Sequence, residues 1–226
     1  MICIIQARSN SQRFPKKIFK KIGNISILQR IITSMKKVKQ IRSFVVATTK
    51  NKSDLKIIQI SKKNKINFYR GDEKNVASRY YEILKKTKYK YFLRVNGDSP
   101  FLDYKIVNKL ISIKKKKSNY DILTNVFKRS FPRGQSVEII KTNTFIDNFK
   151  NIKAHSDLEH VTSFFYKNFK KFKIYNYKNK INLSKINLSV DTKEDFNKIK
   201  KIFNETNKKN LSWQILTKKY QEIFLK

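Results

Sequence analysis

The sequence predicts an α/β fold in which helices cover both faces of a mostly parallel sheet. Two patterns in the first half of the chain support this prediction. Short, continuous apolar runs such as "MICIIQA" are typical of strands that are buried on both sides. Each such run is followed by a segment with apolar residues at helical spacing, and an alternation of strand and helix is the pattern of parallel sheets.

The alternation continues along the first 120 residues. The expected strands occupy residues 1–7, 43–49, 66–71 and 89–98, and the expected helices occupy residues 27–38, 53–64, 75–87 and 104–117. Ser53 or Asp54 is placed to cap the second of these helices. The ligands of such sheets bind beyond the carboxyl ends of the strands, so the loops there are the first place to seek a site.

After Tyr120 the pattern becomes irregular. Strands are expected at residues 120–126, 136–141 and 172–177, helices at 158–169 and 212–224, and a strand at 186–190 that leads into a helix at 193–205. Thr192 is placed to cap this last helix, with Asp195 as its capping-box partner. Because no Pro/Gly/Ser-rich linker divides the 226 residues, we expect one domain, 1–226.

The composition excludes several classes of protein. A hydrophobic fraction of 39% with 13% aromatic residues is enough for a sizeable core, which argues against a disordered chain. No apolar run approaches the roughly 18 residues of a membrane span, and the apolar start is too short for a signal peptide. The single cysteine, Cys3, cannot form an intrachain disulfide. We therefore expect a cytoplasmic protein without a membrane partner.

The net charge of +37 suggests a nucleic-acid partner, but the kind of basic residue argues otherwise. Only nine of the 53 basic residues are arginine, and the chain is rich in isoleucine and asparagine, which share AT-rich codons with lysine. The lysines are also spread over every amphipathic segment. We favour compositional drift and expect no specific nucleic-acid partner; loose attraction to RNA or to a membrane surface is the alternative. Arginine is then the more informative cation.

The loop after the first strand contains a cluster of cations. Arg8, Ser11, Arg13 and Lys17 lie between a strand end and a helix, where guanidinium groups, a hydroxyl and backbone N–H groups could converge on a triphosphate. The alternative is a solvated basic turn in a basic protein. The loop is not the usual Gly-rich phosphate loop, because the chain has no glycine before Gly23.

Two aspartates follow apolar strands elsewhere in the chain. Asp98 lies in "VNGDSPFLD" and Asp191 lies in "LSVDT". Mg²⁺ prefers one or two protein carboxylates together with nucleotide phosphate oxygens, so two strand-end aspartates could hold one ion between them. Either residue alone could equally be a turn or helix-cap residue.

Three further polar residues lie between the two aspartates. Glu138 follows the turn "FPRGQ" on an expected strand, and Glu159 and His160 lie on an expected helix. His160 could have a structural role or contact a substrate. With only one other histidine, His155, and one cysteine, the chain has no cluster with zinc-ligand spacing.

Seven motifs in order carry a resemblance to a known family. "IIQARSNSQRFPKK", "VVAT", "YRGDEKNVASRYY", "RVNGDSPFLD", "FPRGQSVEI", "LEHVTSFFY" and "LSVDTKEDF" resemble the cytidylyltransferases of the spore-coat polysaccharide biosynthesis type. These are relatives of the enzymes that make CMP-activated acylneuraminate and 3-deoxy-manno-octulosonate. The similarity covers about residues 1–203. It implies a Rossmann-like three-layer α/β/α nucleotidyltransferase fold, and a homodimer formed through a small acceptor and dimerisation subregion at about residues 130–177.

The resemblance also implies an activity and a site. The implied reaction is Mg²⁺-dependent transfer of CMP from CTP to an acidic sugar of the nonulosonic or ulosonic acid type, with release of pyrophosphate, for surface polysaccharide biosynthesis. The implied contacts are Arg8, Ser11, Arg13, Lys17 and Asp98 with the nucleotide phosphates, Ala47, Thr48 and Arg79 with the base and ribose, Asp98 and Asp191 with Mg²⁺, and Glu138, Glu159 and His160 with the acceptor. Arg13, Lys17, Asp98 and Asp191 would be the catalytic residues.

Two positions depart from the pattern of the family. Lys16 stands where a glycine often precedes the lysine of the first loop. After the "FPRG" turn the chain reads Gln135-Ser136-Val137-Glu138, where many relatives have Leu-Asp-Val-Glu. Because this string lies toward the acceptor in the family, the missing carboxylate leaves the identity of the sugar open.

Two other functions remain as alternatives. One is a nucleotidyltransferase that uses another nucleoside triphosphate and a sugar phosphate. The other is a basic nucleic-acid-binding protein, which the two strand-end aspartates disfavour because they would repel phosphate unless a metal ion lay between them.

Overall fold

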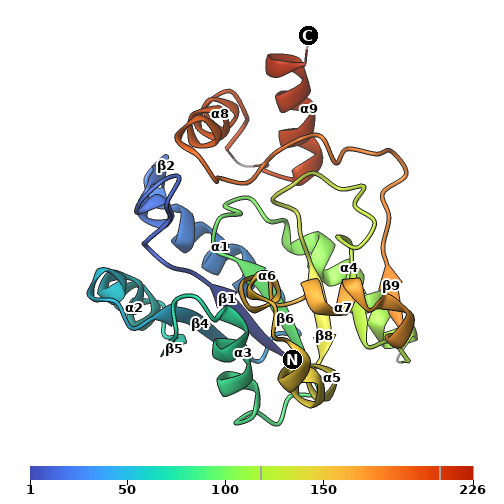
Figure 1. The fold of residues 1–226 in the computed structure, drawn as a ribbon. Coiled ribbons are helices and arrows are strands. Elements are labelled where there is room, and N and C mark those ends of the chain that lie inside the picture. Colours follow the sequence, from blue (N-terminus) through green and yellow to red (C-terminus); the bar gives the residue numbers. More distant parts are fainter. Residues whose placement is uncertain (118, 209, 226) are drawn as a thin grey trace.

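The computed structural model describes residues 1–117, 119–208 and 210–225. These residues form a seven-stranded sheet in the order β5-β4-β1-β6-β8-β7-β9 (Figure 1). The strands are β1 (Ile2–Gln6), β4 (Ser43–Thr49), β5 (Asn67–Gly71), β6 (Tyr91–Asn96), β7 (Ile122–Thr124), β8 (Glu138–Lys141) and β9 (Ile174–Asn176). Strands β5, β4, β1 and β6 are parallel, β8 is antiparallel to both of its neighbours, and β9 is parallel to β7. The predicted mostly parallel sheet is confirmed.

Helices cover both faces of this sheet. The longer helices are α1 (Ile27–Lys36), α2 (Leu55–Lys63), α3 (Val76–Leu84), α4 (Tyr104–Lys116), α8 (Lys193–Asn204) and α9 (Trp213–Phe224). The shorter ones are α5 (Thr142–Asn148), α6 (His155–Glu159) and α7 (Ser163–Lys167), and a small hairpin pairs β2 (Lys21–Ile22) with β3 (Ile25–Ser26).

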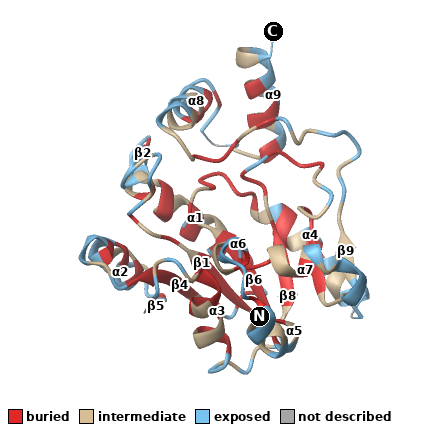
Figure 2. Ribbon diagram, viewed as in Figure 1, coloured by how far each residue is buried: buried red, intermediate tan, exposed pale blue. Residues whose placement is uncertain are grey.

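The alternation of side chains along β1 divides the core into two layers. Cys3 and Ile5 pack into one apolar cluster with residues of α1, α2, α4, α8 and α9. Ile2 and Ile4 point to the opposite face and pack with residues of α3, α5 and α7. Figure 2 shows the central strands as the most deeply buried part of the molecule. The three-layer arrangement that the sequence predicts is therefore present.

Two expected elements in the second half of the chain are wrong. The helix expected at residues 158–169 is instead divided between α6, α7 and a short 3-10 turn, because β-branched Val161 and Thr162 are poor helix formers and are buried between the two helices. The strand expected at 186–190 forms only an isolated bridge, between Arg133 and Asn187. The Asn187 side chain accepts hydrogen bonds from the backbone and hydroxyl of Ser189, which competes with strand pairing.

The start of α8 follows the prediction. The Thr192 side chain accepts a hydrogen bond from the Asp195 backbone, and the Asp195 carboxylate accepts one from the Thr192 backbone. This capping box fixes the backbone immediately after Asp191. In the part of the chain that the structure describes, no helix is both long and apolar enough to cross a membrane.

Candidate active site

The loop after β1 and the loop after β6 meet at the carboxyl edge of the sheet. The Gly97 backbone N–H donates to the Gln6 carbonyl at 2.8 Å. A Cβ atom at Gly97 would lie 2.6 Å from that carbonyl oxygen, so the close approach requires glycine. The contact places Asp98 directly beside the loop that begins at Ala7.

A second close approach brings Asp191 to the same place. Gly134 has φ +87°, and a Cβ there would lie 2.5 Å from the Leu188 backbone. The segment that follows Leu188 then runs past the end of β6, where the Val190 N–H donates to the Asp98 carbonyl at 2.8 Å. The two aspartates, which are 93 positions apart in the sequence, therefore lie at one site.

Lys17 links the two carboxylates. Its Nζ lies 2.9 Å from Asp191 Oδ1 and 3.8 Å from Asp98 Oδ2, and it also donates to the Val190 carbonyl at 2.7 Å. Arg13 Nη2 lies 3.5 Å from Asp191 Oδ1, with 70% of its side chain exposed. Lys17 thus contacts both carboxylates, and the exposed Arg13 contacts one of them.

The electrostatics of the pair favour an additional cation. Burial raises the pKa of Asp98; Lys17 opposes this effect and the charge of Asp191 adds to it, and the pKa stays above its usual value. Within the described residues no group of three His, Cys, Asp or Glu side chains could hold a metal ion. A cation at this site would have two carboxylates and need further oxygens from a ligand, a donor set that fits Mg²⁺ bound with a nucleotide.

Arg8 approaches the site from the other side of the loop. Its Nη2 lies 3.1 Å from Glu159 Oε1 of α6, and its Nη1 donates to the Glu73 carbonyl at 3.3 Å. About a third of each side chain in this ion pair is exposed. Glu159, which the resemblance assigns to the acceptor, therefore holds Arg8 in this structure.

Asp54 anchors the same loop from behind. Its buried carboxylate accepts hydrogen bonds from the Ser9 backbone at 2.7 Å, from the Thr48 hydroxyl at 2.8 Å, and from the backbone and hydroxyl of Thr49. Burial alone would raise the pKa of Asp54, but these hydrogen bonds outweigh it and lower the pKa. Asp54 occupies the N-cap position of α2, one of the two positions that the sequence predicts. Its carboxylate bonds to Ser9 and the end of β4, however, and makes no capping bond within the described residues.

A cavity of about 450 Å³, the first cavity, opens between these loops. It brings together most of the residues that the sequence singles out, namely Arg8, Ser11, Arg13, Lys17, Arg79, Asp98, Glu159, His160 and Asp191. Ala47 and Thr48 are fully buried in β4 and do not line it. The Ala47 carbonyl instead accepts a hydrogen bond from Arg79 Nη1 at 3.3 Å. Ala47 therefore supports Arg79, which lines the cavity, from behind.

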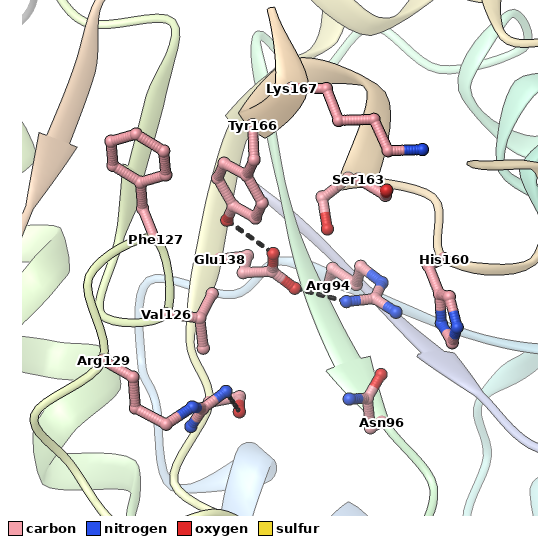
Figure 3. Close-up of a pocket in the computed structure, with 12 residues that line it drawn as sticks. Arg94, Asn96, Val126, Phe127, Arg129, Glu138, His160, Ser163, Tyr166 and Lys167 are labelled. Carbon is pink, nitrogen blue, oxygen red and sulfur yellow. Dashed lines mark hydrogen bonds and ion pairs between the residues drawn. The ribbon is translucent and has the colours of Figure 1, made fainter. Parts of the chain in front are cut away.

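A second cavity of about 550 Å³ adjoins the first (Figure 3). Arg94, Asn96 and His160 line both cavities and so form their common wall. Glu138 lines only the second cavity. Glu159, another predicted acceptor contact, lines only the first.

A buried ion pair forms the floor of the second cavity. Arg94 and Glu138 are almost fully buried and make a direct ion pair, and the Tyr166 hydroxyl donates to Glu138 at 2.6 Å (Figure 3). Arg94 Nε also donates to the Gln6 side chain at 3.1 Å. Burial alone would raise the pKa of Glu138, but the charge of Arg94 and the hydrogen bond from Tyr166 lower it. Glu138 is therefore ionised and already engaged.

The sequence reasoning missed several residues of both cavities. These are Gln6, Arg94, Asn96, Arg129, Ser136, Tyr166 and Lys167. Asn96 stands two positions before Asp98 and could have been found from the same strand end. Arg94 and Arg129 are two of only nine arginines, and the scarcity of arginine is the signal that could have identified them.

Comparison with known families agrees with the geometry. A family model described as "Cytidylyltransferase" matches residues 2–222. The chain belongs to the cytidylyltransferase family. It is therefore a nucleotidyltransferase, and the family predicted from the ordered motifs is confirmed.

Individual relatives of this cytidylyltransferase support the assignment. The spore coat polysaccharide biosynthesis protein SpsF of Bacillus subtilis is 26% identical over 212 residues, covering 90% of this chain and 86% of the relative. A 3-deoxy-manno-octulosonate cytidylyltransferase of Rickettsia prowazekii is 32% identical over 129 residues, covering 55% of this chain and 51% of the relative. A solved cytidylyltransferase structure from Leptospira borgpetersenii has a TM-score of 0.91 and 29% identity, covering 98% of this chain and 94% of the other.

Proposed function

We propose that this cytidylyltransferase transfers CMP from CTP to an acidic sugar in a Mg²⁺-dependent reaction that releases pyrophosphate, for surface polysaccharide biosynthesis. The observation that supports this proposal is the pairing of two adjoining cavities. One cavity combines cations with two carboxylates, and the other shares a wall with it through Arg94, Asn96 and His160. A reaction between a nucleotide and a second substrate needs such neighbouring sites.

The first cavity suits a nucleoside triphosphate. Arg8 and Arg13 are held by ion pairs with partly exposed carboxylates, and such pairs contribute little to stability, so phosphate oxygens can replace the carboxylates at low cost. Ser11 adds a hydroxyl and Lys17 an ammonium group to the same space. We assign these four residues to the triphosphate, with Arg13 and Lys17 stabilising the charge that develops on the leaving pyrophosphate.

Asp98 and Asp191 would hold Mg²⁺. A bound ion would supply neutralisation of phosphate charge and a lower pKa for the attacking hydroxyl. Lys17 keeps both carboxylates in place through its contacts at 3.8 Å and 2.9 Å. The acceptor would occupy the second cavity, where His160 and Asn96 on the common wall orient its hydroxyl toward the α-phosphate.

The names of the relatives motivate the choice of substrates. One relative is a 3-deoxy-manno-octulosonate cytidylyltransferase, and another takes part in spore coat polysaccharide biosynthesis. From these two relatives we infer an acidic sugar as the acceptor of the present chain. Homodimerisation through residues 130–177 and a cytoplasmic location stay predictions, and light scattering of the purified protein tests the first of them.

Pyrophosphate release tests the proposed function. Purified protein is incubated with CTP, Mg²⁺ and a panel of acidic sugars that includes 3-deoxy-manno-octulosonate and N-acetylneuraminate, and pyrophosphate is measured. We expect release with at least one acid, and loss of release when Mg²⁺ is chelated. No release with any acceptor, together with no heat of CTP binding in calorimetry, would contradict the proposal. Competition among the four nucleoside triphosphates separates CTP from another donor.

A further inference from the structure

The second cavity contains several charged groups, and most of them are already paired. Arg94 is bonded to Glu138, and Lys167 Nζ lies 2.6 Å from Asp157 Oδ1. In both pairs a carboxylate of the protein neutralises the cation. These two cations therefore do not favour the binding of an anionic ligand.

Arg129 is the exception. Its Nη2 donates to the Ser136 hydroxyl at 3.1 Å. Its Nη1 is buried and has no hydrogen-bond partner, and Arg129 has no ion pair, among the residues that the structure describes. In Figure 3 the side chain reaches the cavity from the segment that also carries Val126 and Phe127.

Among the residues that the structure describes, none forms an ion pair with this guanidinium. Burial lowers the pKa of Arg129, the charge of Glu138 opposes that effect, and Arg133 adds to it. Glu138 is bonded to Arg94 and Tyr166, so its charge is shared with another cation. An arginine remains protonated in proteins, so the second cavity keeps one positive charge that has no ion-pair partner in the described part of the chain.

An unpaired buried donor on a charged group is costly unless a ligand satisfies it. A carboxylate oxygen could accept from Arg129 Nη1. Because the Ser136 oxygen already accepts from Arg129, its own O–H remains to donate to the second carboxylate oxygen. One guanidinium and one hydroxyl suit a ligand that has a single negative charge and two coplanar oxygens.

We propose that Arg129 and Ser136 form the site that recognises the carboxylate of the acceptor sugar. The inference rests on the proposed function, because the second cavity receives an acceptor only if the nucleotide occupies the first. It assigns the specificity for acidic sugars to a pair of side chains outside the nucleotide site. A sugar phosphate, which carries about two charges at neutral pH, is a poorer match for one unpaired cation.

A charged substitution and its uncharged counterpart test the assignment. Ser136→Asp adds a carboxylate beside Arg129, whereas Ser136→Asn adds a side chain of the same shape without the charge. We expect Ser136→Asp to raise the KM for the acidic sugar about 30-fold, because it neutralises Arg129 and repels the substrate. Ser136→Asn should raise it only about threefold, through loss of the hydroxyl. The affinity for CTP, measured by calorimetry, should stay the same in both.

Two arginine variants separate recognition from general charge. Arg129→Gln and Arg133→Gln each remove one positive charge from the same loop, but Arg133 is exposed and does not line the second cavity. We expect Arg129→Gln to raise the KM for the acidic sugar about 10-fold or more. Arg133→Gln should change it less than about twofold. For the carboxamide analogue of the sugar, the KM should be the same in the wild type and in both variants. If Arg129 had only a structural role, Arg129→Gln would raise the KM for the analogue as well.

The outcomes distinguish this inference from the proposed function. CTP binding with pyrophosphate release, but equal KM values for Ser136→Asp and Ser136→Asn, would overturn the inference and keep the function. An effect of Arg133→Gln as large as that of Arg129→Gln, or a sugar phosphate that outcompetes every acidic sugar in the wild type, would also overturn it. Absence of CTP binding would refute the proposed function through the nucleotide site, where neither Arg129 nor Ser136 lies.

Discussion

The two adjoining cavities are both lined by arginines and carboxylates, yet an arginine–carboxylate ion pair in each is buried to a different degree. In the first cavity the ion pair of Arg8 and Glu159 is 34% and 39% exposed. In the second cavity the pair of Arg94 and Glu138 is 9% and 3% exposed. Exposed pairs contribute little and can be exchanged for ligand charges, whereas a buried pair cannot be broken cheaply. Under the proposed function, pairing of the same kind thus serves ligand binding in the first cavity and stability of the fold in the second.

The largest expected effect comes from breaking the buried pair. Glu138→Gln leaves Arg94 buried without its counter-charge, so the free energy of unfolding should fall by about 3–5 kcal/mol. Glu159→Gln is the matched control from the first cavity, and it should lower the free energy of unfolding by less than about 1 kcal/mol. Urea denaturation of both variants at pH 7 measures the difference. Equal losses of stability would remove the distinction between the two cavities.

Asp98 should show the opposite behaviour, with a large effect on activity and a small one on stability. Asp98→Asn removes one of the two carboxylates proposed to hold Mg²⁺, and we expect the kcat for pyrophosphate release to fall about 100-fold or more. The side chain is 27% exposed, so the variant should keep the wild-type melting temperature in circular dichroism. Retained activity at saturating Mg²⁺ would show that Asp98 is not a ligand of the metal.

Asp54 combines both behaviours, because its buried carboxylate supports the exposed loop of the first cavity. Its pKa is lowered in the folded protein, so the ionised carboxylate stabilises the fold at neutral pH. This contribution is complete above the unfolded pKa of about 3.9 and is lost as the pH falls through the lower, folded value. Asp54→Asn should therefore lower the free energy of unfolding by about 1.5–3 kcal/mol at pH 7.

The pH dependence provides the check on Asp54. Urea denaturation of wild type and Asp54→Asn is compared at a series of pH values from neutral to strongly acidic. We expect the difference between the two proteins to shrink once the pH falls below about 4, because the wild-type carboxyl then becomes protonated. Other carboxylates titrate in both proteins and cancel in the comparison. A difference that stays constant over the whole range would show that ionisation of Asp54 does not matter.

The first cavity could be predicted from the sequence because regular structure builds it. In a parallel sheet the carboxyl ends of neighbouring strands meet at one edge, so residues after β1 and β6 must lie together. This rule predicted that the loops after the strands, including those that carry Lys17 and Asp98, form the site, without any knowledge of side-chain directions. The family resemblance, and not this rule, assigned Ala47 and Thr48 to the base and ribose; both are buried in the sheet and do not line the first cavity.

The second cavity could not be predicted in this way. Its walls come from β6, the antiparallel strand β8, the segment before it and the short helix α7, and no single period or motif connects these elements. Arg129, from an irregular segment, and Tyr166, from α7, are brought together only by tertiary packing. The motif containing Glu138 marked the right region, but only the structure shows that its carboxylate is engaged by Arg94. Sequence patterns marked only the region of this cavity and gave no account of its charges.

The smallest expected effect concerns the backbone of the first loop. Lys16 has φ 57°, a left-handed conformation that costs an L-residue about 1–2 kcal/mol, and the family resemblance implies a glycine at this position. Glycine would relieve this strain but lose more entropy on folding, so Lys16→Gly should raise the free energy of unfolding by about 0.5–1 kcal/mol. Lys20→Gly is the control, because Lys20 has φ −62° and glycine there should instead destabilise.

Urea denaturation of both lysine variants measures whether the free energy of unfolding changes with opposite sign. Because each variant loses one positive charge, the effect of charge cancels in the comparison. A shift of both variants in the same direction would show that charge, and not backbone strain, dominates at Lys16. The opposite signs would identify Lys16 as a strained position in the loop beside the first cavity. The strain is tolerated because the Lys16 N–H donates to the Ser9 carbonyl at 2.8 Å, and Ser9 is itself held by Asp54. The buried carboxylate behind the loop thus fixes the turn that positions Lys17 between the two aspartates.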